Sequence, residues 1–361
     1  MNQVFLRFVL SVTILCIFDV QLNLSHPYCT LEDIESLEGK WIPAVVWQPT
    51  CNATPFVPRF RPDHIQNRIC NQSVSEYVVP IISNCRLRDL SPSLVACAKA
   101  ITENRKYIMA GDSLTGQSME ALRVVGLSSL SSFESVYQFP YLRYLSNITF
   151  HIEDVGVLLH PEVEHYIASA TPNDVLIYNS GAWWSNSALR NKELFSNERL
   201  ERHTKTTQTH ISIQSGTSGH ELLILDLYER SLILLAKTMK EAGLTLVLRA
   251  TFPAIHISDA PAIWSRRLFS SYNRIMKQVA KDFGVIYIDI GNLLYREDIQ
   301  LHIFDDLHYC VAYVDPEKPQ DPCRWSSAFH LFQRVYMHLM IEIEQTVFNA
   351  GLPPACRVLI E

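Results

Sequence analysis

Apolar residues in this chain fall into short runs and longer spaced segments, which alternate from about residue 104 onward. The short runs predict buried strands, because strands covered on both faces are apolar almost throughout. These runs are 106–110, 147–157, 174–178, 244–249 and 285–290. The longer segments have helical spacing and three are followed by a glycine; they are 114–125, 222–242, 268–283 and 326–348. Strands that alternate with helices predict a parallel sheet covered by helices on both faces.

The part of the chain before residue 104 does not show this alternation of strands and helices. It is rich in loops, prolines and cysteines, and few of its residues follow a clean periodicity. We therefore divide the chain into a signal peptide or signal anchor (1–25), a cysteine-rich N-terminal subdomain (26–103) and an α/β domain (104–361).

The N-terminus carries an apolar segment of eleven residues. Residues 8–18 are apolar apart from Ser11 and Thr13, follow Arg7 and end before Asp19, which matches the length and flanks of the apolar region of a secretory signal peptide. A type II membrane anchor over residues 4–24 is the alternative, and both interpretations stay open. Any contact with a membrane is expected only through this segment.

Cysteines and glycosylation sequons favour the secretory pathway. Of the nine cysteines, Cys16 lies in the apolar run and eight remain, an even number that suits four disulfides in an oxidising compartment. The sequence does not choose among the pairings that eight cysteines allow. Sequons begin at Asn23, Asn52, Asn71 and Asn147. We expect a protein of the Golgi lumen or a secreted one.

The composition excludes several classes of protein. The chain has 361 residues, of which 48% are hydrophobic and 19% charged, with a net charge of −6. A disordered chain has fewer apolar residues and a larger net charge. Acidic residues outnumber basic ones 37 to 31, which argues against a nucleic-acid partner. No CxxC pair is present, and we expect neither a metal nor a bound cofactor.

Polar and reactive residues follow the predicted strands one after another. Ser113 follows the first strand, Asn179 the third and His256 the fourth, while Asp305 and His308 lie beyond the last. The carboxyl ends of parallel strands meet at one edge of a sheet, where ligands bind. We therefore expect these residues to form one site, although His256 reads equally well as an ordinary loop histidine.

The residue types at this site suit nucleophilic catalysis. A serine hydroxyl attacks when a base takes its proton and a third group orients that base. Asp305 and His308 are three residues apart, so the carboxylate can hold the imidazole while the imidazole faces Ser113. The backbone N–H of Ser113 and the amide of Asn179 would stabilise the oxygen that becomes negative. Each motif alone is common, and their combination predicts a Ser-His-Asp hydrolase or acyltransferase.

These segments resemble a known family. Gly-Asp-Ser at 111–113, Asn-x-Gly at 179–181 and Asp-x-x-His at 305–308 resemble the SGNH (GDSL) hydrolase superfamily. The stretches YIMAGDSLTGQS, VLIYNSGAWW, LRATFPAIH and DDLHYC are similar, more closely, to its trichome-birefringence-like branch and the PC-esterase relatives of that branch. The resemblance covers about residues 40–335. It implies an SGNH-type three-layer α/β/α fold and acyl-ester chemistry on polysaccharides in the Golgi.

The resemblance also implies roles for single residues. The nucleophile, general base and orienting acid that it implies are Ser113, His308 and Asp305. Asn179 falls on the oxyanion position beside the backbone of the serine. The superfamily has a further glycine donor, for which Gly126 is our candidate and Gly156 the alternative.

Substrate-binding positions follow in the same way, and they are Gln117, Gly181, Trp183, Trp184 and His256. Trp183 and Trp184 fall on the family's tryptophan pair, near where a sugar ring can stack. Gln117 matches the family's pattern, but Gly116 stands where the family often has an arginine three residues after the serine. That departure puts part of the oxyanion or donor binding in doubt.

We interpret the chain as a glycan O-acetyltransferase that works through an acyl-enzyme, with an acetyl donor as co-substrate. A carbohydrate O-acetyl esterase is the alternative, because the residues are the same and only the acceptor differs. A non-catalytic glycan-binding relative and a lipase-like GDSL esterase are further alternatives. The expected partner is a glycan or another acyl ester, and the oligomeric state is left open.

Overall fold

The architecture was analysed in a computed structural model of the chain. It describes residues 26–43, 47, 69–70, 78–127, 131–132, 161–172, 174–179, 181, 219–252, 266–294, 309, 312–313 and 324–359. The candidate signal or anchor segment (1–25) and the strand predicted at 147–157 lie outside these residues.

The centre of the molecule is a parallel sheet in the order β5-β4-β6-β7-β8. Its strands are β4 (Tyr107–Gly111), β5 (Ser131–Ser132), β6 (Val175–Asn179), β7 (Thr245–Arg249) and β8 (Ile286–Ile288). Every pairing between neighbours is parallel. Every residue of β4 and β6 is buried, as expected for strands covered on both faces.

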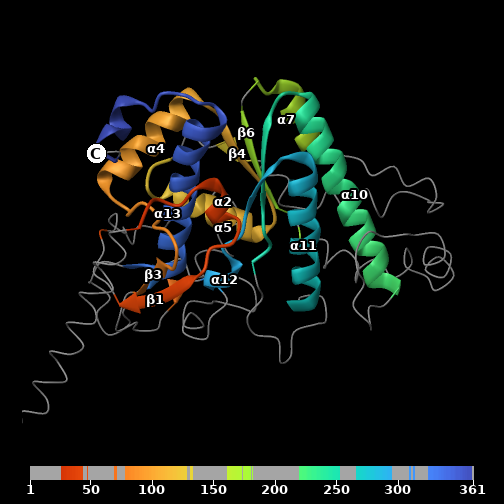
Figure 1. Cartoon of the computed structure of the whole chain (residues 1–361), viewed down its shortest axis with the longest axis horizontal. Helices are drawn as coiled ribbons and strands as arrows, with labels where there is room; N and C mark the ends of the chain where they lie inside the picture. Colours follow the sequence, from red (N-terminus) through yellow and green to blue (C-terminus); the bar gives the residue numbers. More distant parts are fainter. Residues whose placement is uncertain are drawn as a thin grey trace, which may run out of the picture.

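Helices cover the sheet on both sides (Figure 1). The helices α10 and α11 lie on one side and α4, α5 and α13 on the other. The longer helices are α4 (Pro92–Asn104), α5 (Ser113–Arg123), α7 (Pro161–Ser169), α10 (Gly219–Glu241), α11 (Arg266–Phe283) and α13 (Ser327–Glu342). The α/β fold with a parallel sheet between helical layers, which the sequence pattern predicts, is thereby confirmed.

Most predicted elements agree with the structure to within a few residues. Gly126, Gly243 and Gly284 follow the ends of α5, α10 and α11 with positive φ, as expected of glycines that end helices. The helix α7 and the strand β5 have no predicted counterpart, and two further segments differ from the prediction. The loop-rich N-terminal part contains the regular helix α4, and the last helix ends at Glu342 and continues as a π-helix over Ile343–Val347.

The N-terminal segment covers the edge of the sheet next to β8. It contains α2 (Leu31–Ile34) and an antiparallel pair of strands, β1 (Gly39–Pro43) and β3 (Val78–Ile82). Asp289, just after β8, donates its N–H to Ile34 O at 3.0 Å and accepts from Leu37 N at 3.2 Å. These bonds occupy backbone groups that an exposed edge strand would offer to other chains.

A second small sheet joins distant parts of the chain. The strand β9 (Ala312–Tyr313) pairs with β2 (Ile69–Cys70) on one side and with β10 (Arg324–Trp325) on the other.

A short helix, α12 (Gly291–Leu294), follows β8, and Leu293 O accepts a hydrogen bond from the indole of Trp41 at 2.8 Å.

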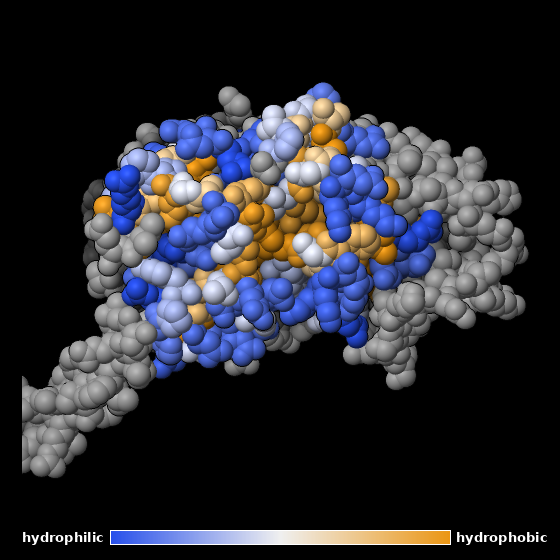
Figure 2. Space-filling view, turned by 45° about the horizontal axis from the view of Figure 1, so that its top comes forward, coloured by the Kyte–Doolittle hydropathy of each residue, from blue (hydrophilic) through white to orange (hydrophobic). Residues whose placement is uncertain are grey.

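Residues of the N-terminal segment and of the sheet belong to the same hydrophobic core. Ile34 and Trp41 are part of the cluster that also contains Ile177 of β6 and Phe332 of α13. The hydropathy of one face is shown in Figure 2, where hydrophobic residues gather in the middle and hydrophilic residues lie around them. Burial of this shared core therefore stabilises the N-terminal segment and the sheet together.

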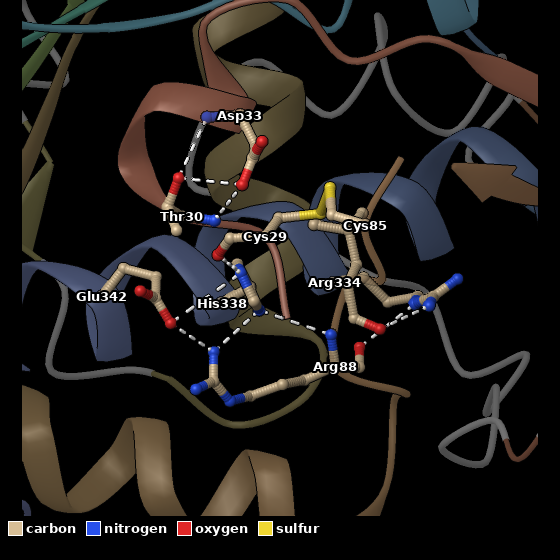
Figure 3. Close-up of a disulfide and its surroundings, with 9 residues drawn as sticks. Cys29, Thr30, Asp33, Cys85, Arg88, Arg334, His338 and Glu342 are labelled. Atoms are coloured by element: carbon tan, nitrogen blue, oxygen red, sulfur yellow. Dashed lines mark hydrogen bonds and ion pairs between the residues drawn. A yellow bond between two sulfur atoms is a disulfide. The ribbon is translucent and has the colours of Figure 1, made fainter. Parts of the chain in front are cut away.

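A buried polar cluster fixes the N-terminal segment to α13 (Figure 3). Arg88 donates from its guanidinium to Nδ1 of His338 at 2.9 Å and to Glu342 at 2.7 Å. Because arginine only donates, Nδ1 accepts, so Nε2 carries the hydrogen and donates to Cys29 O at 2.7 Å. Burial, and then the nearby Arg88 charge, lower the pKa of His338 to about 3. The ring is therefore neutral at ordinary pH.

Two disulfides are present among the described residues, and four are expected for the chain. Cys29–Cys85 closes the N-terminal segment, and Cys97–Cys356 joins α4 to the 3-10 helix at Pro354–Leu359. Disulfides persist in oxidising compartments, which indicates the secretory pathway. In the described part of the chain, the helices are too short or too polar to cross a membrane.

Candidate active site

The sheet has one point at which the direction of its strand order reverses. From β4 the chain adds β5 on one side and then crosses to add β6 on the other. In open parallel sheets, ligands bind outside the carboxyl ends of the two strands that flank such a reversal. Here these ends are Gly111 and Asn179, which are register partners across β4 and β6. The backbone topology thus places the candidate site beside Ser113.

Ser113 is the first residue of α5, and Asp112 caps that helix. One carboxylate oxygen of Asp112 accepts from the backbone N–H groups of Leu114 and Thr115, each at 3.1 Å. A helix N-terminus carries a partial positive charge and N–H groups that can face an anion. The side chain of Ser113 lies outside the described residues, and its backbone begins α5 just after the carboxyl end of β4.

The approach of β4 to β6 requires a glycine immediately before this cap. Gly111 has a φ of 152°, and a Cβ there would lie 1.6 Å from the carbonyl oxygen of Asn179. The same carbonyl oxygen accepts the N–H of Asp112 at 3.0 Å. The turn from β4 into α5 is therefore held directly against the end of β6.

Asn179 is fully buried, and its side-chain amide is engaged at both ends. The nitrogen donates to Arg249 O and, at 3.1 Å, to Oγ1 of Thr251, while the oxygen accepts the N–H of Gly181 at 3.3 Å. A Cβ at Gly181 would lie 2.0 Å from that Thr251 hydroxyl. An oxyanion that binds this amide would therefore replace one of its present acceptors.

Thr251 is held by a two-point backbone contact from α11. Its N–H donates to Oδ1 of Asn273 at 2.7 Å, and its carbonyl oxygen accepts from the same amide at 2.9 Å. Asn179, Thr251 and Asn273 thus form a continuous amide and hydroxyl chain along the carboxyl edge of the sheet. Buried polar groups that are satisfied in this way have fixed orientations.

A buried cation lies beneath the start of α5. Arg249, the last residue of β7, is 1% exposed and forms an ion pair with Asp112 at 3.2 Å. Its guanidinium also donates to Oγ1 of Thr115 at 2.7 Å and lies 4.2 Å from the ring centre of Phe252. The helix that carries Ser113 is therefore attached by a charged pair to the end of β7.

The other end of the first turn of α5 is attached to the segment that follows His308. Gln117 donates from its amide to Tyr309 O at 2.8 Å and accepts the N–H of Tyr309 at 3.2 Å. Gln117 is 3% exposed. This residue, which we expected to contact substrate, uses both ends of its amide on the protein backbone.

The structure brings together the predicted positions Ser113, Gln117, Asn179 and Gly181. It does not bring Gly126 to them, because that residue follows the opposite end of α5 and donates its N–H to Arg123 O at 2.8 Å. The remaining predicted site residues lie outside the described residues; they are Asp305, His308, Trp183, Trp184 and His256, with the alternative glycine Gly156.

Sequence pattern alone did not point to five residues that hold this site, which are Asp112, Thr115, Arg249, Thr251 and Asn273. One signal was present for Arg249, which is a charged residue at the end of an otherwise apolar strand run. Such a residue at the carboxyl edge of a buried sheet needs a partner, because an unpaired buried charge is costly. Asn273 lies on a helix with no local signal of its role.

A separate cavity of about 610 Å³ lies along α11 and β8, with Glu35, Asn273, Lys277, Tyr287 and Asp289 among its lining residues. Burial raises the pKa of Asp289. Over the described part of the chain, no group of three or more His, Cys, Asp or Glu side chains could hold a metal ion.

The chain is similar to several solved structures. No family model and no curated protein matches the chain. The chain is similar to Axe2, an acetylxylan esterase from Geobacillus stearothermophilus, with 18% identity over 66% of this chain and 94% of that one, and a TM-score of 0.31. A catalytic mutant of Axe2 is similar at 18% identity over the same shares of the two chains, with a TM-score of 0.30. The chemistry of the site is accordingly argued from the residues of this chain.

Proposed function

We propose that this chain is a serine enzyme that removes acyl groups from O-acylated glycans through an acyl-enzyme on Ser113. The observation that carries the proposal is the position of Ser113. It begins a capped helix at the strand-order reversal, next to the buried amide of Asn179. A nucleophile at a helix N-terminus beside amide donors suits a reaction in which an oxygen becomes negatively charged.

The reaction needs a base for the serine, and His308 is the residue we assign to it. The oxygen of Ser113 attacks the acyl carbon while its proton passes to the imidazole, which Asp305 orients. The bond to the sugar oxygen breaks, and that oxygen takes the proton. Water then attacks the acyl-enzyme, gives a proton to the imidazole and releases the carboxylic acid, and the serine oxygen regains its proton.

The glycan substrate is proposed from the continuation of the site. Trp183 and Trp184 follow Gly181 within three residues, and their rings suit stacking on a sugar. Gly181 itself is at the carboxyl edge of the sheet, where its N–H donates to Asn179. The chain thus leads from Asn179, the proposed oxyanion residue, to aromatic side chains that suit a sugar.

Transfer of the acyl group to a sugar hydroxyl is the second candidate. The segments around Ser113 and Asn179 are similar to those of the trichome-birefringence-like branch, which includes polysaccharide O-acetyltransferases. The acyl-enzyme would form in the same way, and a sugar hydroxyl would attack it in place of water. An acetyl donor would then be a co-substrate, and the Golgi lumen is the compartment we propose for this activity.

One experiment separates these functions. Purified protein would be given O-acetylated and plain oligosaccharides, a labelled acetyl donor and water enriched in heavy oxygen, and the products would be measured by mass spectrometry. Hydrolysis through an acyl-enzyme releases acetate that contains heavy oxygen, whereas transfer adds label to the sugars.

Variants show whether either product depends on the proposed nucleophile. Ser113→Ala should abolish the product. Ser118→Ala is the matched control, because that serine is buried in the same helix and donates to Leu114 O at 3.0 Å. Activity that survives Ser113→Ala would refute the proposal, and binding without turnover would favour a glycan-binding protein.

A further inference from the structure

A pair of hydrogen bonds made by one side chain joins α5 to the residue that follows His308. The amide of Gln117 donates to Tyr309 O at 2.8 Å and accepts from Tyr309 N at 3.2 Å. The two residues are 192 positions apart in the chain. An amide that pairs with both backbone groups of a single residue fixes that residue in direction as well as in distance.

In the sequence, the two residues of this pairing lie near the proposed nucleophile and the proposed base. Gln117 lies four residues after Ser113 in α5, so the two positions share one face of the helix. Tyr309 is the residue directly after His308. The contact therefore joins α5, whose first residue is the proposed nucleophile, to the backbone of the residue that follows the proposed base.

The side chain of Tyr309 is fixed in an aromatic cluster. It is 1% exposed and packs edge-on against Phe252 at 6.3 Å and Phe332 at 5.8 Å between ring centres. Phe252 and Phe332 are themselves stacked at 5.2 Å. The ring anchors the segment behind the site, and the amide of Gln117 sets how its backbone faces α5.

We propose that Gln117 is a positioning residue that sets His308 against Ser113, and that it does not contact the substrate. The inference rests on the proposed function. Its amide is used at both ends on the backbone of Tyr309, and its side chain is 3% exposed, so the contacts that it makes hold the protein rather than a sugar or an acyl group. A base that is misplaced by about 1 Å can lose about 100-fold in rate.

The first test is the substitution Gln117→Met, which keeps the length of the side chain and removes both hydrogen bonds. With p-nitrophenyl acetate as the probe, we expect kcat to fall about 100-fold while KM changes little. A residue that binds substrate would instead raise KM with kcat kept. Gln117→Glu is the second variant, because a carboxylate keeps the acceptor for Tyr309 N and loses the donor; it should fall between Met and the wild type.

The second test asks whether the loss acts through the histidine. Gln117→Met would be made in the wild type and in a His308→Ala background, and the rate of nitrophenol release would be compared. If Gln117 acts only through His308, its substitution changes the rate less than about twofold once the histidine is gone. A general distortion of α5 would lower both rates by the same factor.

A matched control separates positioning from stability. Gln333 of α13 is also a buried glutamine, and its amide donates to Ala121 O of α5 at 2.9 Å. Gln333→Met should leave kcat within about twofold of the wild type, and the unfolding midpoints of the two variants would show how much of each effect is a loss of stability.

The outcomes are distinguishable from those of the proposed function. If Ser113→Ala does not lower the wild-type rate, the proposed function fails, and the positioning role fails with it. If the wild type depends on Ser113 but Gln117→Met keeps its kcat, or loses the same factor in both backgrounds, the positioning role alone is refuted. Should Gln117→Met not fold, the same cycle run with Gln117→Glu decides the question.

Discussion

The buried ion pair of Arg249 and Asp112 offers a test of how the start of α5 is held. The substitution Arg249→Met leaves a hydrophobic side chain of similar length against Phe252 and removes the charge. Asp112 would remain fully buried and would lose this ion pair, while it keeps the backbone N–H groups of Leu114 and Thr115. Asp112→Asn removes the negative charge instead, so that Arg249 loses this ion pair. Asparagine also caps helices well, so the cap of α5 is kept.

The size of the effect follows from burial. The two charged groups are 3.2 Å apart, with side chains 1% and 0% exposed, so solvent screens them little. Removing one member of such a pair costs roughly 3–5 kcal/mol, because an uncompensated charge stays buried. Against a total stability of roughly 5–15 kcal/mol this is a large loss. At about 2–4 °C for each kcal/mol, the unfolding midpoint should fall by about 6–20 °C.

The assays are thermal unfolding, which gives the midpoint, and urea unfolding, which gives the free energy, both at neutral pH and followed by tryptophan fluorescence and near-UV circular dichroism. The double variant that carries both substitutions should be less destabilised than the sum of the single variants, because neither charge is then left alone. Destabilisation of less than about 1 kcal/mol in Arg249→Met would refute the reasoning. So would a double variant whose cost equals the sum, because the two groups would then be independent.

Three further predictions follow from other features. Gly181→Ala should lower kcat by at least 10-fold and cost about 1–3 kcal/mol of stability, because its Cβ would displace the Thr251 hydroxyl that accepts from Asn179; unchanged turnover would contradict this. The low pKa of His338 means that the unfolded chain takes up a proton between about pH 6.5 and pH 3 while the folded chain does not. Stability should therefore fall as the pH is lowered through that window, and His338→Gln should flatten the slope measured by denaturation at pH 7 and pH 5. Replacing Cys97 and Cys356 by serine should cost about 2–5 kcal/mol; a midpoint equal to the wild type would show that this disulfide adds nothing.

The strands and the main helices were predictable because their cause is local. A strand covered on both faces must be apolar along its length, and β4, β6 and β7 are runs of that kind. The helix α4 had local signals too, since Ser91 caps it and Pro92 begins it, and serine before proline is a typical helix start. The high density of cysteines and loops around it led to a wrong prediction for that segment.

The contacts that hold the site were less predictable because they depend on the order of the strands. Nothing near Arg249 in the sequence indicates that its partner is Asp112, which is 137 residues away. The pairing exists because β6 lies between β4 and β7 and leaves their carboxyl ends at one edge. Gln117 was singled out from the family's pattern, but its partner Tyr309 becomes evident only when the two segments meet. Local pattern identifies the reactive residue types, and the topology determines which of them touch.

The Cys97–Cys356 disulfide has a mechanical consequence. All strands of the parallel sheet and the helices α5 to α13 lie between these two cysteines. A tension applied before Cys97 and after Cys356 would first pull the N-terminal segment off the edge of the sheet. It would then pass from one sulfur to the other and would not extend the chain between them, and Cys29–Cys85 would protect residues 29–85 in the same way. Reduction of these bonds would therefore decide whether a pulling force can extend the α/β part of the chain.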